Sequence, residues 1–131
     1  SVTSDSGSPV ESNVTLTSTT DSSKTFTVTT TDGAYEITVP NDTYKFVVTK
    51  KAHLSYTKNE LAVNADVVKD VKLLGGDVNS DSKINFDDLL TLLAVYNTSE
   101  ADSDINADGK IDFDDLLILL SNYSANATVE E

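Results

Sequence analysis

The chain has 131 residues and a formal net charge of −13. Such a length accommodates one or two small domains, and an acidic surface of this strength repels nucleic acid and anionic membranes. No apolar run approaches the roughly 20 residues of a membrane span, so we expect no nucleic-acid partner and no membrane insertion. No signal segment, basic and then apolar, opens the sequence, so a secreted form would contain this chain as part of a longer protein.

The first 75 residues read as a linker followed by short strands. Residues 1–12 are rich in Ser, Asp and Gly without periodicity, which predicts a flexible linker. In residues 13–75, apolar and polar residues alternate in short runs, and Asp32-Gly33 between two such runs is a hairpin signal. This spacing predicts a small all-β antiparallel sandwich. Its alternating apolar positions include Val14, Leu16, Phe26, Val28, Tyr35, Ile37, Val39, Tyr44, Phe46, Val48, Val67 and Val71.

Little in this first part carries recognisable catalytic chemistry. His53 is the only histidine and the chain has no cysteine, so neither a second histidine nor a thiolate can join it in a transition-metal site. The sequence shows no recognisable Ser/His/Asp arrangement for nucleophilic catalysis. A glycosidase needs two carboxylates facing a sugar cleft, for which a module this small has little room. We therefore expect no enzyme activity.

The second part of the chain holds one pattern twice, from Asp77 to Tyr96 and from Asp104 to Tyr123. A repeat this regular indicates two copies of one supersecondary unit. Most of the negative charge lies here, because residues 75–131 carry 13 acidic and 2 basic residues, against 9 and 7 in residues 1–74.

Each copy fits a calcium-binding loop. Calcium takes about six to eight oxygen ligands, which an EF-hand loop supplies from positions 1, 3, 5, 7, 9 and 12. Both copies carry Asp or Asn at these positions, except position 7, where a lysine would contribute its backbone carbonyl. Two acidic surface turns are the simpler alternative, but they would not recur with matching helices behind them. We predict two Ca²⁺ ions, ligated by Asp77, Asn79, Asp81, Lys83, Asn85 and Asp88 and by Asp104, Asn106, Asp108, Lys110, Asp112 and Asp115.

The loops depart from the common pattern in three ways. Ser82 stands at the sixth position, where the second loop has Gly109, and a non-glycine residue with positive φ carries strain, so we expect a weaker first site. Position 12 is the shorter Asp rather than Glu. No helix precedes either loop, which makes each copy a half EF-hand and argues against a calmodulin-like switch.

A leucine-rich helix is predicted after each loop. Four leucines fall within five residues, and such a run covers more than one stripe of a helix. Two short helices that pack together therefore leave apolar surface exposed, as a partner-binding face.

The duplicated segment, with its Asp-x-Asn-x-Asp start and its Phe-Asp-Asp-Leu-Leu end, resembles a dockerin. Dockerins are calcium-binding modules of cellulosome-type, polysaccharide-degrading assemblies, and they bind cohesins. The run from Thr31 to Phe46 resembles the carboxypeptidase-regulatory-like, Ig-type modules that precede some dockerins as X modules. The resemblance implies an X-like β-sandwich at residues 13–75, an α-helical dockerin with two half EF-hand repeats at 76–124, and a C-terminal tail at 125–131.

The resemblance also implies a partner-binding face. Cohesin contacts in dockerins come from the end of the calcium loop and the exposed helix face. Many type I dockerins carry Ser-Thr where this chain has Phe86-Asp87 and Phe113-Asp114, which favours a scaffoldin-anchoring type. The similarity of the copies predicts two binding orientations about 180° apart. The matching positions are Phe86, Asp87, Leu90, Leu93, Ala94, Asn97, Phe113, Asp114, Leu117, Leu120, Ser121 and Ser124.

These observations predict a non-catalytic, calcium-dependent docking module. Its partner would be a cohesin domain of a scaffoldin or a cell-surface anchoring protein, in a secreted complex at a bacterial cell surface. The alternative is a calcium-stabilised extracellular surface or adhesion module without a cohesin partner. Cohesin repeats or a glycosidase elsewhere in the gene would favour docking, and adhesive repeats would favour the alternative.

Overall fold

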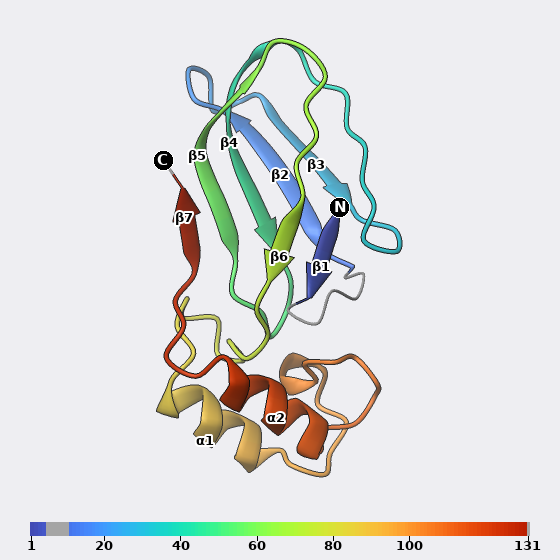
Figure 1. Cartoon of the computed structure of the whole chain (residues 1–131), viewed down its shortest axis with the longest axis vertical. Coiled ribbons are helices and arrows are strands. Elements are labelled where there is room, and N and C mark those ends of the chain that lie inside the picture. The colour runs from blue at the N-terminus through green and yellow to red at the C-terminus, as the bar shows by residue number, and fades with distance from the viewer. Residues whose placement is uncertain (5–10, 131) are drawn as a thin grey trace. The chain divides into compact units, whose positions relative to one another are not determined.

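The computed structural model describes residues 1–4 and 11–130. They fall into two compact units that interleave along the sequence (Figure 1). The first unit contains residues 1–49, 55–73 and the C-terminal residues from Thr128, and the second contains residues 50–54 and 74–127. The predicted linker at residues 1–12 lies partly outside the described residues, which omit 5–10, and part of the remainder is a strand.

A five-stranded sheet forms most of the first unit. Its strands are β2 (Asn13–Ser18), β3 (Thr25–Thr29), β4 (Asp42–Thr49), β5 (Tyr56–Val63) and β7 (Thr128–Glu130), in the order β3-β2-β4-β5-β7. Alternation along β2 and β4 places one set of side chains in the core and the other toward solvent. The buried set includes Val14, Leu16, Tyr44, Phe46 and Val48.

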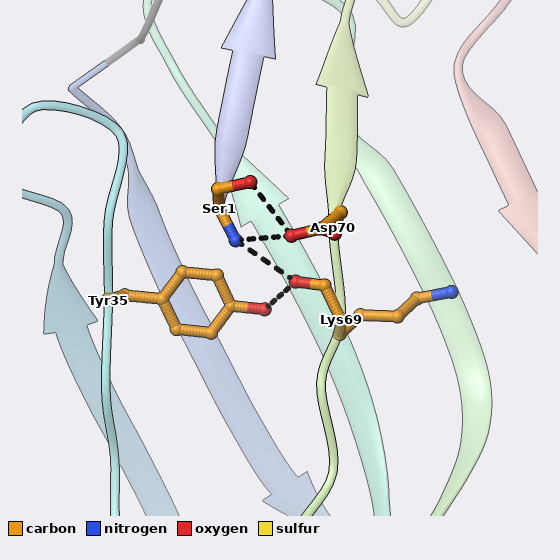
Figure 2. A network of polar contacts seen from close by, with 4 residues as sticks. All are labelled: Ser1, Tyr35, Lys69 and Asp70. Carbon is orange, nitrogen blue, oxygen red and sulfur yellow. Dashed lines mark hydrogen bonds and ion pairs between the residues drawn. The ribbon is translucent and has the colours of Figure 1, made fainter.

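A second, smaller sheet pairs β1 (Val2–Ser4) with β6 (Val71–Leu73) in parallel. Figure 2 shows the polar contacts at one end of this pair, where the Ser1 ammonium and hydroxyl groups donate to the Asp70 carboxylate at 2.8 and 2.7 Å. The Tyr35 hydroxyl donates to the Lys69 carbonyl at 2.6 Å. Burial raises the pKa of Tyr35 to about 12, with a smaller effect of the Asp70 charge, so this phenol stays protonated and keeps its bond.

The Asp32-Gly33 turn forms as predicted, but the strand expected after it does not pair. Thr31 and Ala34 exchange backbone hydrogen bonds of 2.9 Å, and Asp32 and Gly33 have φ angles of 49° and 75°. Positive φ at both central residues is the geometry of a type I′ hairpin turn. Beyond it, residues 35–40 alternate between half-buried and exposed side chains without strand pairing.

The predicted fold class, an antiparallel sandwich followed by an α-helical dockerin, is wrong. The described chain is mostly β, and its two α-helices have nine residues each. Two strand pairings, β1 with β6 and β5 with β7, are parallel. The two units are not consecutive, because β7, from the predicted tail, adds to the sheet of the first unit. Local alternation predicts that a run is a strand, but it cannot show which distant run becomes its partner.

The second unit contains α1 (Phe86–Ala94), α2 (Phe113–Ser121) and a 3₁₀ turn, η1 (Ala101–Ser103). Within the described residues, no helix is long and apolar enough to cross a membrane. The core of this unit comes from the loops as much as from the helices, because two loop isoleucines are fully buried with one leucine of each helix. Its most buried members are Ile84, Ile111, Leu92 and Leu119.

Gly75 packs tightly in this core. A Cβ atom there would lie 2.5 Å from Ile105 Cγ2 and 2.9 Å from Ile118 Cγ2. Because such overpacking forces neighbouring side chains to move, Gly75→Ala is expected to lower the free energy of unfolding by about 1–3 kcal/mol, measured by urea denaturation. Gly109→Ala is the control, since a Cβ at Gly109 meets nothing within 4 Å and only its φ of +87° adds strain. An undiminished stability of Gly75→Ala would contradict this packing argument.

Candidate metal centre and exposed helix face

Two groups of three carboxylates lie in the two loops of the second unit. Asp77, Asp81 and Asp88 each place one ligand oxygen within 4.8 Å of the others. The equivalent Asp104, Asp108 and Asp115 do the same in the second loop. These are positions 1, 5 and 12 of the predicted calcium loops, so the fold brings together residues that are up to eleven positions apart in the pattern.

The first aspartate of each loop organises the turn. The Asp77 carboxylate accepts hydrogen bonds from the backbone N–H groups of Asp81 and Ser82 at 3.1 and 3.0 Å. Asp104 likewise accepts from Asp108 and Gly109 at 3.3 and 2.8 Å. The sixth position has positive φ in both loops, 70° at Ser82 and 87° at Gly109. Ser82 therefore holds the strained conformation that glycine adopts freely.

The last aspartate of each loop joins the loop to the helix behind it. Asp88 is fully buried, and its carboxylate accepts from the backbone N–H groups of Val78, Asn79 and Asn85 at 3.0, 3.3 and 2.9 Å. Asp115, also fully buried, accepts in the same way from Ile105, Asn106 and Asp112 at 2.8, 3.1 and 3.0 Å. Both residues complete a capping box at the start of their helix.

Burial and charge crowding shape the ionisation of these groups. Burial raises the pKa of Asp77, and the neighbouring Asp88 and Asp81 charges raise it further, against backbone hydrogen bonds that lower it. Burial also raises the pKa of Asp115, with a smaller effect from Asp104. With no cation bound, these two groups favour the folded state at low pH and lose that contribution as the pH rises through their folded pKa. A bound cation would remove this repulsion.

The other predicted ligands have local hydrogen-bonding roles. The side-chain oxygens of Asn79 and Asn106 accept from the N–H groups of Asp81 and Asp108 at 3.2 and 3.3 Å. Those of Asn85 and Asp112 cap the helices, accepting from Asp87 and Asp114 at 3.0 Å each. Lys83 and Lys110 have exposed side chains. Their backbone N–H groups donate to the carboxylates of Asp81 and Asp108 at 3.0 Å each.

The donor set fits a hard divalent cation such as Ca²⁺. The predicted side-chain ligands of the two loops offer carboxylate or amide oxygens, which suit calcium and magnesium better than softer transition metals. A third group, Asp108, Asp112 and Asp114, also places ligand oxygens within 4.8 Å of one another, so the second loop holds more closely spaced carboxylates than the first.

Each loop forms backbone hydrogen bonds with the residues that follow the helix of the other copy, an arrangement that the sequence did not predict. The backbone N–H group of Ile84 donates to the Ala125 carbonyl at 2.9 Å, and the Ile84 carbonyl accepts from the Ser124 N–H group at 2.7 Å. The first loop therefore pairs with the chain after α2. The backbone N–H group of Ile111 donates to the Thr98 carbonyl at 2.8 Å, and the Ile111 carbonyl accepts from the Asn97 N–H group at 2.7 Å. The second loop therefore pairs with the chain after α1. Asn97 and Ser124 occupy matching positions and both have positive φ, 67° and 74°. Nothing in the local residue pattern signals this exchange.

The predicted partner face is exposed in both copies. Phe86 and Phe113 are each 57% exposed, and Leu93 and Leu120 are 48% and 47% exposed. Leu90 and Leu117, at another pair of equivalent positions, are 49% and 45% exposed. The remaining six predicted positions are exposed as well, namely Asp87, Ala94, Asn97, Asp114, Ser121 and Ser124. The second unit thus presents large apolar side chains in two equivalent sets.

Comparison with solved structures finds a shared fold. A chain in the crystal structure of a type II cohesin–X-dockerin complex from Acetivibrio cellulolyticus, an N-terminal interface mutant, matches with a TM-score of 0.65 and 22% identity. A chain in the corresponding C-terminal interface mutant matches with a TM-score of 0.66 and 23% identity. Each match covers 96% of this chain and 94% of the other, so the likeness extends over nearly the whole chain as one fold. No protein-family model and no curated protein sequence matches the chain.

Proposed function

We propose that the second unit is a dockerin-type docking module that holds a Ca²⁺ ion in each loop and binds a cohesin domain through its exposed helix face. The observation that carries this proposal is the duplicated loop and helix. Each copy combines three converging carboxylates with an exposed phenylalanine and two exposed leucines. Exposed apolar side chains gathered on one element are the usual mark of a protein-binding surface.

The comparisons support a role in assembly. The solved structures with a similar fold are parts of type II cohesin–X-dockerin complexes. This supports an extracellular bacterial complex as the setting and a docking role rather than catalysis. Because those complexes contain both partners, the choice of the dockerin side depends on this chain's own duplicated calcium-type loops.

Calcium would couple the loops to the partner face. Carboxylates at positions 1, 5 and 12 would hold the ion, and Asp88 and Asp115 also cap the helices that carry the exposed leucines. Ligands that converge only in the folded state turn part of the metal-binding energy into folding energy. The apolar character of Phe86 and Phe113 favours the cohesin of a scaffoldin or of a cell-surface anchoring protein as the partner.

Titration calorimetry of the whole chain against a panel of cohesins and dockerins tests the proposal. We expect one-to-one binding to a cohesin in calcium, and binding at least about 100-fold weaker in chelator, which corresponds to about 2.7 kcal/mol. Binding to dockerins instead would place the chain on the opposite side of the complex. Calcium uptake without any partner would support a calcium-stabilised surface module.

A further inference from the structure

The pairing of the first loop with the chain after α2 extends further than the matching pairing of the second loop. In both loops, the isoleucine at position 8 forms the two backbone hydrogen bonds described above. In the first loop, the Ala127 N–H group also donates to the Ser82 carbonyl at 2.9 Å, and Lys83 forms an antiparallel bridge with Asn126. Residues 124–127 therefore form a short antiparallel ladder along positions 6 to 8 of the first loop.

The equivalent segment beside the second loop takes a different course. Glu100 occupies the position that matches Ala127, but its N–H group donates to the Thr98 hydroxyl at 3.3 Å. Within the described residues, no backbone hydrogen bond joins Glu100 to Gly109, and the chain continues as the 3₁₀ turn η1. After Ala127, in contrast, the chain continues as the strand β7 (Figure 1). The two copies therefore differ in the segment that follows the helix as well as in the loop itself.

The longer ladder acts at the residue where the first loop departs from the common pattern. Ser82 has a φ of 70°, a conformation that is strained for a residue with a side chain, and Gly109 has a φ of 87° at the same position. Ser82 is held on both sides, because its N–H group donates to the Asp77 carboxylate at 3.0 Å and its carbonyl accepts from Ala127. Gly109 has the equivalent of the first bond, to Asp104 at 2.8 Å, and adopts positive φ without strain. The extra bond thus coincides with the extra strain.

The ladder also orients the predicted ligand at position 7. The Ser82 carbonyl and the Ile84 N–H group both take part in the ladder bonds. A trans peptide unit directs its N–H and C=O groups to opposite sides, so the N–H and carbonyl groups of Lys83 point away from residues 124–127. The Lys83 N–H group accordingly donates to the Asp81 carboxylate at 3.0 Å. The Lys83 carbonyl therefore faces the side of the loop on which a predicted calcium ligand lies.

We propose that residues 124–127 hold the first calcium loop in its ion-binding conformation, with Ala127 as a positioning residue. The bond from Ala127 keeps Ser82 at positive φ and so keeps the Lys83 carbonyl directed toward the ion. The second loop has Gly109 at this position and does not depend on such a bond. This role rests on the proposed function, because it concerns the calcium ion of the first loop, and it makes the two sites dependent on different parts of the chain.

Removal of the Ala127 donor tests this role, and proline serves because it has no N–H group. In Ala127→Pro, the calcium affinity of the first loop should fall by about tenfold, or about 1.4 kcal/mol, and that of the second loop should not change. Glu100→Pro is the matched control, since Glu100 already has the φ of −64° that proline imposes, and both sites should keep their affinity.

Calcium titrations of the chain without a partner, followed by NMR, measure the two loops separately. The amide signals of Ser82 and Gly109 are the reporters, because each amide donates to the first aspartate of its loop. Absence of calcium uptake by the unaltered chain would overturn the proposed function and this role with it. Uptake of two ions that Ala127→Pro leaves unchanged, or weakens equally in both loops, would overturn only the role of Ala127.

A second substitution distinguishes relief of strain from loss of packing, because Ala127 also packs against the core of the second unit. Glycine at position 82 adopts positive φ without the bond from Ala127. In the Ser82→Gly chain, Ala127→Pro should therefore weaken the first site by no more than about twofold. An equal loss with serine and with glycine would show that Ala127 acts through packing alone and would overturn the proposal.

Amide hydrogen exchange of the unaltered chain gives a test that does not depend on the folding of a variant. In calcium, the Ala127 amide should exchange at least about tenfold more slowly than the Glu100 amide, because only the former donates to its loop. Equal exchange of the two amides would contradict the ladder and overturn the proposal even if Ala127→Pro failed to fold.

Discussion

Replacement of both Asp88 and Asp115 by alanine should unfold the second unit even in calcium. Each carboxylate is fully buried and accepts three backbone hydrogen bonds that join its loop to its helix. Leaving a buried donor unpaired costs about 1–3 kcal/mol. One of the three bonds in each loop is buried and the other two are partly buried, so the two replacements together remove a large part of the stability of a small domain, which is about 5–15 kcal/mol. Under the proposed function, each replacement also removes a calcium ligand.

Amide hydrogen exchange provides the measurement, because it reports the two units separately. Protection of Ile84, Leu92 and Leu119 should be lost in the double variant, while Val14 and Val48 of the first unit keep theirs. Under the proposed function, chelator added to the unaltered chain should also lower the protection of the second unit, because calcium would bind only where the folded loops bring the carboxylates together. A double variant that retains protection at Leu92 and Leu119 would show that these carboxylates are dispensable.

A matched control lies next to each buried carboxylate. Asp87 and Asp114 occupy the same first helical turns, but their side chains are exposed. Replacing both by alanine removes a favourable interaction with each helix dipole, worth about 0.3–1 kcal/mol, and takes one carboxylate from the group of Asp108, Asp112 and Asp114, but it leaves the buried hydrogen bonds of Asp88 and Asp115 in place. The second unit should therefore stay folded, and the contrast between the two pairs would separate buried hydrogen bonding from loss of negative charge.

Local patterns predicted the parts of this molecule that depend on nearby residues. The spacing of Asp77, Asp81 and Asp88 is sufficient to place their carboxylates together, because the loop that joins them is short and is closed by their own hydrogen bonds. The Asp32-Gly33 turn follows from the conformational freedom of those two residue types. The exposure of Leu90, Leu93, Leu117 and Leu120 follows from leucine runs too wide for a single buried stripe.

The parts that could not be predicted depend on pairing between distant segments. Val2 pairs with Val71, and Tyr56 with Thr128, in parallel registers that no turn residue specifies. Residues 35–40 have the alternation of a strand but no partner in the described chain, and sequence pattern alone cannot distinguish these cases. The crosswise pairing of Ile84 with Ala125 is hidden for the same reason.

Aspartate substitutions at Leu93 and Leu120 should distinguish one binding orientation from two, under the proposed docking function. Both leucines sit at the same position of equal nine-residue helices, and they are 48% and 47% exposed. If either copy can face the partner, Leu93→Asp or Leu120→Asp alone removes one of two equivalent complexes. The affinity should then fall by only about twofold, or about 0.4 kcal/mol.

The double variant should bind far more weakly than either single variant predicts. With both copies altered, every orientation places a carboxylate in the apolar interface, and an unpaired charge there costs several kcal/mol. Calorimetry in calcium should show a loss of at least about 100-fold. Glu100→Gln, which changes an exposed carboxylate outside the predicted face, is the control and should bind like the unaltered chain. A loss of affinity of about 100-fold from one single variant and none from the other would contradict the two orientations, because only the copy that contacts the partner is sensitive to substitution. The similar exposure of the two faces would then reflect their duplicated sequence and not a shared use in binding.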